Sequence, residues 1–278
     1  MRFSKLKGLI PMNKHGPKKF PSFKNPPVIE VVCGVYFDPI KSFKVHHLGL
    51  FWQKVKDEFP ECEHAVRLGI DPENGPLDLG SYVPRAWFIN EEQNRLIQLQ
   101  DDIFFFNWRK MKEDEPYPRY STIIEKFKVN LEVLQKFLKE ENLGLVNPKA
   151  CELTYINHIP KGAGWESLRD INGVFRDIAW NSVSKRFLPD PRHISGQIIF
   201  PLPDDNGSLT LRLEHGKRKQ DDLPVLILHN CARGLGQNKS MEDMWKWFEI
   251  AHEWIVRGFA DLTTPTIQKE VWQRIDID

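Results

Sequence analysis

The chain has 278 residues, of which 41% are hydrophobic, 12% aromatic and 28% charged, with a formal net charge of +1. These values are typical of a globular domain with a sizeable core, and they give no global electrostatic reason to expect nucleic acid or acidic membranes as partners. The four cysteines are isolated and no apolar run approaches the roughly 20 residues of a membrane helix, so we expect a cytoplasmic protein without disulfides.

The first 24 residues are basic and interrupted by proline. They contain Arg2 and six lysines, with no acid before Glu30. This composition predicts a solvated tail over 1–24, with nucleic-acid binding through the tail as the alternative. The ordered domain is then expected to span 25–278.

The first half of the domain begins with a predicted strand. Alternating apolar residues indicate a strand at 28–37, and a three-and-four spacing indicates a helix at 45–59. A β-rich region follows over 65–108, with a turn cluster at 72–76. Within and after it we predict a hairpin of 85–90 and 94–100, an aromatic strand at 103–108 and a long amphipathic helix at 120–138.

The second half repeats this order. A strand at 150–159 precedes a helix that Ser167 opens through a capping pattern and whose apolar face extends to Ile178. Strands at 194–202, 208–215 and 223–231 and helices at 241–262 and 265–272 complete it. We therefore predict an α+β fold of two pseudo-repeated strand-helix-multistrand-helix halves, about 25–145 and 146–278, with a mostly antiparallel sheet and helices packed on it.

The segment from Gly234 to Ser240 lies between a predicted strand and a predicted helix, as a phosphate-binding loop does. The motif needs glycine before its lysine, but Asn238 precedes Lys239. A helix cap at Ser240 is the favoured interpretation.

Some of the histidines lie near other potential metal ligands. Glu249 and His252 are three apart on a helix, but a carboxylate-bridged site needs a second such pair. His46 and His47 with Cys62 and His64 match no known ligand spacing. We predict no metal, no cofactor and no catalytic residue set.

Two basic clusters, at 109–112 and 217–219, are each followed by acids, which favours solvated loops. The run Phe104–Phe106 can suggest base stacking, but a buried aromatic strand is favoured.

Polar residues also alternate along two predicted strands. Glu152 and His158 share one face of the first, and Arg212 and Glu214 share one face of the second. If the strands are neighbours, the polar face either lines a pocket or meets water. These four residues are the acid–base and charge-stabilising candidates if the protein is a hydrolase or a nucleotide-modifying enzyme.

Several short segments occur in a distinctive order. They are Asn25-Pro26-Pro27 with Glu30, Asn107-Trp108-Arg109 after Gln98, Tyr117-Pro118-Arg119-Tyr120, Tyr155-Ile156-Asn157, and a closing stretch from His252 to Trp272. Together they resemble a sporadically distributed prokaryotic family of about this length without an assigned activity. The resemblance spans about 25–275 and supplies no catalytic residues. The family's patchy occurrence implies an association with mobile accessory genes, including antiphage defence.

The leading functional hypothesis is a non-enzymatic binding component that recognises a protein partner or a small ligand. The residues predicted for its surface are polar or aromatic and lie mostly near the ends of elements, where binding sites concentrate. They are Asn107, Trp108, Arg109, Tyr117, Arg119 and Asn157, with Glu152, His158, Arg212 and Glu214 as further candidates.

Overall fold

A computed structural model describes residues 20–68, 83–180, 187–218 and 221–276. The tail up to residue 19 and the turn cluster predicted at 72–76 lie outside this part. The strands are β1 Val28–Phe37, β2 Glu61–Ala65, β3 Arg85–Ile89, β4 Arg95–Leu99, β5 Ile103–Arg109, β6 Pro148–Pro160, β7 Ser195–Pro201, β8 Ser208–Lys217 and β9 Pro224–Gly234. The helices are α1 Val45–Val55, α2 Tyr120–Glu140, α3 Ile171–Val174, α4 Met241–Leu262 and α5 Pro265–Glu270, with 3₁₀ turns η1 Leu168–Asp170 and η2 Pro203–Asp205.

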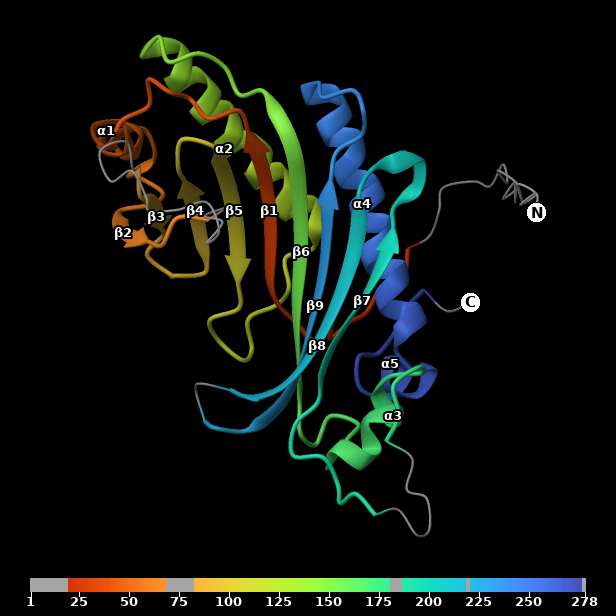
Figure 1. The fold of residues 1–278 in the computed structure, drawn as a ribbon. Helices are drawn as coiled ribbons and strands as arrows, with labels where there is room; N and C mark the ends of the chain where they lie inside the picture. The colour runs from red at the N-terminus through yellow and green to blue at the C-terminus, as the bar shows by residue number, and fades with distance from the viewer. Residues whose placement is uncertain (1–19, 69–82, 181–186, 219–220, 277–278) are drawn as a thin grey trace, which may run out of the picture.

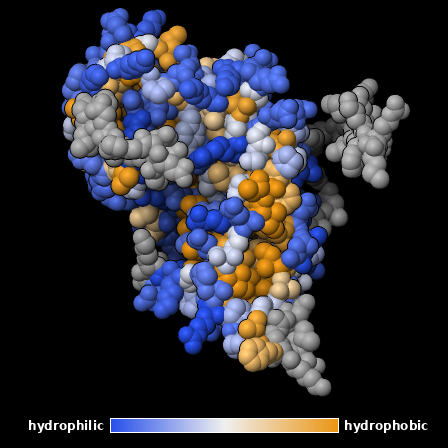
Figure 2. Space-filling view, viewed as in Figure 1, coloured by the Kyte–Doolittle hydropathy of each residue, from blue (hydrophilic) through white to orange (hydrophobic). Residues whose placement is uncertain are grey.

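The strands form one sheet in the order β2-β3-β4-β5-β1-β6-β9-β8-β7, and every neighbouring pair is antiparallel. Helices α2 and α4 lie across one face, behind the strands in Figure 1. Figure 2 shows the opposite face, which is hydrophilic over much of its area and hydrophobic over β7 and the adjoining strands. The sheet therefore has one helix-covered face and one open face.

The two halves occupy equivalent places on either side of the β1–β6 pair at the centre of the sheet. In the first half β1 is flanked by β5 and then β4, and in the second β6 is flanked by β9 and then β8. Helix α2 follows the strands of the first half, as α4 follows those of the second. The predicted α+β fold of two pseudo-repeated halves is confirmed.

Alternation along each strand decides what the helix-covered face buries. On β1, Val31, Cys33 and Val35 are fully buried beneath the helices. Phe104 of β5 stacks with Phe127 of α2 at a centroid distance of 6.0 Å, and Phe127 also meets Phe248 of α4. The aromatic run 104–106 is a buried strand, which was the favoured interpretation. The helices cover one side of β5, and a small cluster around Val32 covers the other.

Two elements differ from prediction. Strand β2 was missed, because its sequence Glu-Cys-Glu-His-Ala shows no apolar alternation. The helix expected from Ser167 to Ile178 is instead the turn η1 followed by the single turn α3, and Phe175 is already extended. Phe175 forms a β-bridge with Thr263, and the Thr264 hydroxyl donates to the Gly173 carbonyl, so contacts with the α4–α5 junction replace the next helical turn.

Residues 20–24, which composition assigned to the tail, pack against the other end of the described chain. Phe23 is buried and forms a β-bridge with Arg274, and the Lys24 and Asn25 amides donate to the carbonyls of Gln273 and Trp272. We call residues 20–26 the N-terminal strap. No helix in the described ranges has the length and apolar character needed to cross a membrane.

Candidate ligand-binding cavity

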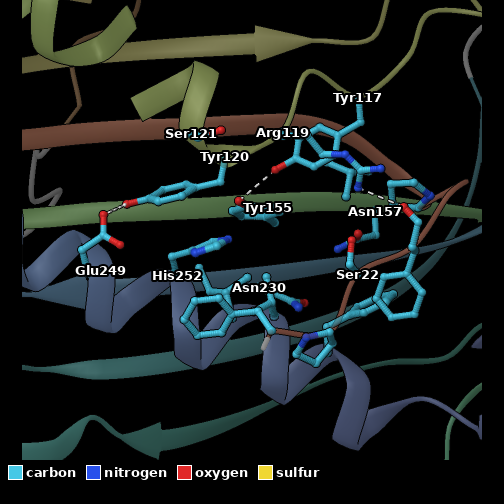
Figure 3. Close-up of a pocket in the computed structure, with 18 residues that line it drawn as sticks. Ser22, Tyr117, Arg119, Tyr120, Ser121, Tyr155, Asn157, Asn230, Glu249 and His252 are labelled. Atoms are coloured by element: carbon cyan, nitrogen blue, oxygen red, sulfur yellow. Dashed lines mark hydrogen bonds between the residues drawn. The ribbon is translucent and has the colours of Figure 1, made fainter. Parts of the chain in front are cut away.

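A cavity of about 340 Å³ lies between the helix-covered face of the sheet, the start of α2 and the middle of α4. Its floor comes from β6 and β9, and the N-terminal strap forms one side. Figure 3 shows the polar side chains around it, which are chiefly Tyr117, Arg119, Tyr155, Asn157, Asn230 and His252. The volume falls at the small end of the roughly 300–1,000 Å³ range of ligand pockets.

Asn230 is the most unusual of these residues. It lies on β9 opposite Tyr155 of β6, on the helix-covered face, where its neighbours along β9, Leu226, Leu228 and Ala232, are apolar. The side chain is 0% exposed, and neither its amide nitrogen nor its carbonyl oxygen has a hydrogen-bond partner among the described residues. A buried unsatisfied polar group typically costs about 1–3 kcal/mol, so this amide lowers the stability of the empty protein.

Two tyrosines add hydroxyl groups to the cavity. The Tyr117 and Tyr155 hydroxyl oxygens are 3.0 Å apart, and burial raises the pKa of both side chains. Both are therefore protonated at neutral pH. One hydroxyl donates to the other, which leaves the second hydrogen for a ligand.

His252 of α4 forms part of the aromatic wall. Its ring stacks on Tyr120 at a centroid distance of 3.8 Å with an interplanar angle of 7°. Phe20 of the strap meets the same ring edge-on at 5.6 Å. Burial lowers the pKa of His252 to about 4, so the imidazole is neutral at pH 7.

Charged groups lie at the exposed rim of the cavity. Arg119 precedes α2, and its guanidinium donates to the Phe23 carbonyl at 2.9 Å. Its backbone has φ 73° and ψ 152°, and a non-glycine residue in so sparsely populated a region costs of order 1–3 kcal/mol. Backbone strain such as that at Arg119 concentrates at ligand sites and switches. Glu249, also at the rim, accepts a hydrogen bond from the Tyr120 hydroxyl at 3.3 Å.

The predicted surface residues divide between the two faces of the sheet. Tyr117, Arg119 and Asn157 line the cavity, and Trp108 packs against Tyr117 at 5.6 Å. Asn157 donates one amide hydrogen to the Leu228 carbonyl at 3.1 Å. The register puts the others on the open face, away from the cavity: Asn107, Arg109, Glu152, His158, Arg212 and Glu214.

Asn107 belongs to a chain of hydrogen bonds across four strands of the open face. Its amide donates to Glu30 at 2.6 Å and its carbonyl oxygen accepts from Gln98 at 2.7 Å. Gln98 in turn accepts from Arg85 at 2.8 Å. Arg109 donates to the Gln93 carbonyl at 2.9 Å. These side-chain hydrogen bonds supplement the backbone pairing of β3, β4, β5 and β1.

The acid–base candidates do not converge on one point. Glu152 accepts from the Tyr36 hydroxyl at 2.9 Å and from Arg233, whereas Arg212 pairs with Glu214 at 3.1 Å. Strand β9 lies between the two groups, so the strands that carry them are not neighbours. Burial lowers the pKa of His158, which keeps it neutral at pH 7.

The remaining sequence candidates have structural roles or no assembled site. The Ser240 hydroxyl accepts from the Asp243 amide at 3.1 Å and caps α4, as favoured. Glu249 and His252 both line the cavity, but no group of three or more potential metal ligands forms within the described residues. Parts of the two basic clusters, Lys110, Lys112 and Lys217, line one groove of about 700 Å³ together with Glu113, a proximity that sequence spacing gave no reason to expect.

Comparisons with known proteins add little to this geometry. No family model matches the chain, and no curated protein matches it. A solved structure described as Methanococcus jannaschii TBP is similar over 82% of this chain and 99% of that chain, at 13% identity and a TM-score of 0.29. So low a score carries no argument about function.

Proposed function

We propose that this chain is a binding component that takes a small, uncharged, planar molecule into the cavity. The observation that supports this most strongly is Asn230, a wholly buried side chain in the cavity wall with both polar atoms unpaired. A side-chain amide presents a donor and an acceptor in one plane. The matching ligand carries an acceptor and a donor side by side, as nucleobases and carboxamides do.

The aromatic walls favour a flat ligand. Tyr120 and His252 form one stacked pair beside the cavity, and Phe20, Phe23 and Phe259 contribute further ring surface. Aromatic side chains stack on the faces of planar heterocycles, and such stacking contributes about 1–3 kcal/mol per base in nucleic-acid complexes. A single heteroaromatic ring system suits a cavity of this volume.

The interior of the cavity is uncharged at neutral pH. His252 is neutral and the buried tyrosines are protonated, whereas Arg119 and Glu249 lie at the exposed rim. A buried charge without a partner is costly, which disfavours an ionised group at the Asn230 end. The rim residues can still contact a substituent of either charge.

The proposed function is therefore the leading hypothesis of a non-enzymatic binding component, with a small ligand rather than a protein partner as the bound species. The enzyme alternative is less well supported, because its four candidate residues lie on the other face of the sheet and apart from one another. Tail-mediated nucleic-acid binding was predicted for residues 1–24, of which 1–19 lie outside the described part. A place in a mobile accessory or antiphage defence system stays a prediction from the family resemblance.

Thermal unfolding with a panel of nucleobases and nicotinamide tests the proposal, together with mass spectrometry of small molecules released from the purified protein. We expect at least one planar amide-type compound to raise the Tm of the wild type, since a ligand that binds only the folded state stabilises it. Asn230→Leu should abolish the shift.

The matched control is Thr210→Val on the open face of the neighbouring strand β8, which should keep the ligand-induced shift. An undiminished shift in Asn230→Leu would refute the assigned site. If no panel member binds and no planar compound is released from the protein, the proposed function is wrong.

A further inference from the structure

The two edges of the sheet are built differently. At one edge, β2 carries Glu61, Glu63 and His64, all exposed. At the other edge, β7 has the sequence Ser-Gly-Gln-Ile-Ile-Phe-Pro, which contains no charge. Charged residues on an edge strand prevent pairing with another chain, so β2 is protected in this way and β7 is not.

The outer edge of β7 is open for pairing. All seven of its residues are exposed, and within the described ranges no backbone hydrogen bond reaches the side away from β8. Ile198, Ile199 and Phe200 are 41%, 58% and 40% exposed. Hydrophobic surface gathers over this strand in Figure 2. Such an edge is a template for strand addition.

The sequence of β7 is complementary to itself. When two antiparallel copies pair through all seven residues, Ile198 lies opposite Ile198 and Gly196 lies opposite Phe200. Gly196, Ile198 and Phe200 are alternate residues of β7, so the side chains of all these pairs lie on the same face of the joined sheet. A Cβ on Gly196 would meet no atom within 4 Å, so space for a phenylalanine ring exists there.

The same chain already uses a glycine–phenylalanine pair at the centre of its sheet. Gly34 of β1 lies opposite Phe105 of β5, and a Cβ on Gly34 would come within 2.2 Å of the Phe105 ring. The ring therefore lies directly over the glycine. Phe200 of one copy can cover Gly196 of the other in the same way.

We propose that two copies of this chain associate through β7, in antiparallel register about Ile198, and join their sheets into one. The contact is isologous, since each copy contributes the same strand. One strand pair is expected to bury less than the roughly 1,200–2,000 Å² of stable interfaces, so the dimer dissociates on dilution.

Sedimentation velocity over a concentration series tests this proposal. The wild-type mass should rise from 32.6 kDa toward twice that value as concentration increases. Ile198→Lys and Ile198→Glu should each stay monomeric, because like charges then face each other across the two-fold axis. Mixing the two variants in equal amounts should restore the dimer through a lysine–glutamate pair.

Leu145→Lys, at a site 67% exposed and away from β7, should dimerise as the wild type does. A wild type that remains at 32.6 kDa throughout overturns the proposal, as do single Ile198 variants that still dimerise. Single variants that are monomeric but do not recombine on mixing rule out the register about Ile198.

Discussion

At the scale of single residues, the cavity brings together three features that each cost stability. Asn230 has an unpaired amide, Arg119 has a strained backbone, and His252 is held neutral. Folding alone gives no reason for three such features to line one cavity. A ligand that hydrogen-bonds the amide and stacks on the rings would offset part of their cost.

The histidine gives a pH-dependent prediction. The pKa of His252 falls from 6.5 to about 4 on folding, so the unfolded chain binds its proton more readily. Stability should therefore fall as the pH drops from about 6.5 to 4, by up to roughly 3 kcal/mol for this residue. His252→Phe keeps the stacking on Tyr120 and should flatten the dependence in urea denaturation series.

His64→Phe on the exposed strand β2 is the control and should leave the dependence unchanged. Other histidines with lowered pKa values, among them His158 and His229, contribute to the slope in all three proteins. Equal slopes in wild type and His252→Phe would contradict the neutral, buried state of the imidazole.

Sequence reasoning found part of the site. Tyr117, Arg119 and Asn157 were singled out, but Asn230 was not, although a polar residue on the apolar side of the 223–231 strand is a visible signal. His252 was named as a possible metal ligand and as the start of the closing stretch of the family resemblance, but not as part of a ligand pocket. The proximity of Asn230 and His252 depends on the order of strands β6 and β9 and on where α4 crosses them. Neither follows from alternation along one strand.

At the scale of elements, the N-terminal strap links one end of the chain to the other. Phe23 lies edge-on to Phe259 of α4 at 5.7 Å and to Trp272 at 6.1 Å. The basic composition of 1–24 predicted a solvated tail instead. The two phenylalanines of the strap form no periodic pattern among the surrounding lysines and prolines that would have indicated burial. The strap is an integral wall of the cavity.

Removing the strap's anchor should therefore destabilise the fold. Phe23→Ala is expected to lower the free energy of unfolding by about 3 kcal/mol, as truncation of a buried phenylalanine typically does. Chemical denaturation measures this change. Leu145→Ala, at an exposed position, should change stability by less than about 0.5 kcal/mol. A Phe23→Ala protein as stable as wild type would show that the strap does not dock.

At the scale of the whole molecule, the pseudo-repeat was predictable because strand and helix periodicities recur in the same order in both halves. The hairpin predicted from 85–90 and 94–100 forms as the antiparallel pair β3 and β4. The strand order was beyond sequence reasoning, since alternation along a strand indicates which face it buries and not which strand lies beside it. That order places the polar open face and the cavity on opposite sides of one sheet.

The free energy of unfolding of Asn230→Leu, measured without ligand, tests the central claim most directly. Leucine removes an unpaired buried amide beside a cavity with room for it, so stability should rise by about 1–3 kcal/mol. Asn157→Leu on the adjacent strand should instead lower stability, because the Leu228 carbonyl loses its side-chain donor. A fall in stability for Asn230→Leu would mean that the amide already has hydrogen-bond partners within the protein. The main observation in favour of a ligand in the cavity would then be contradicted.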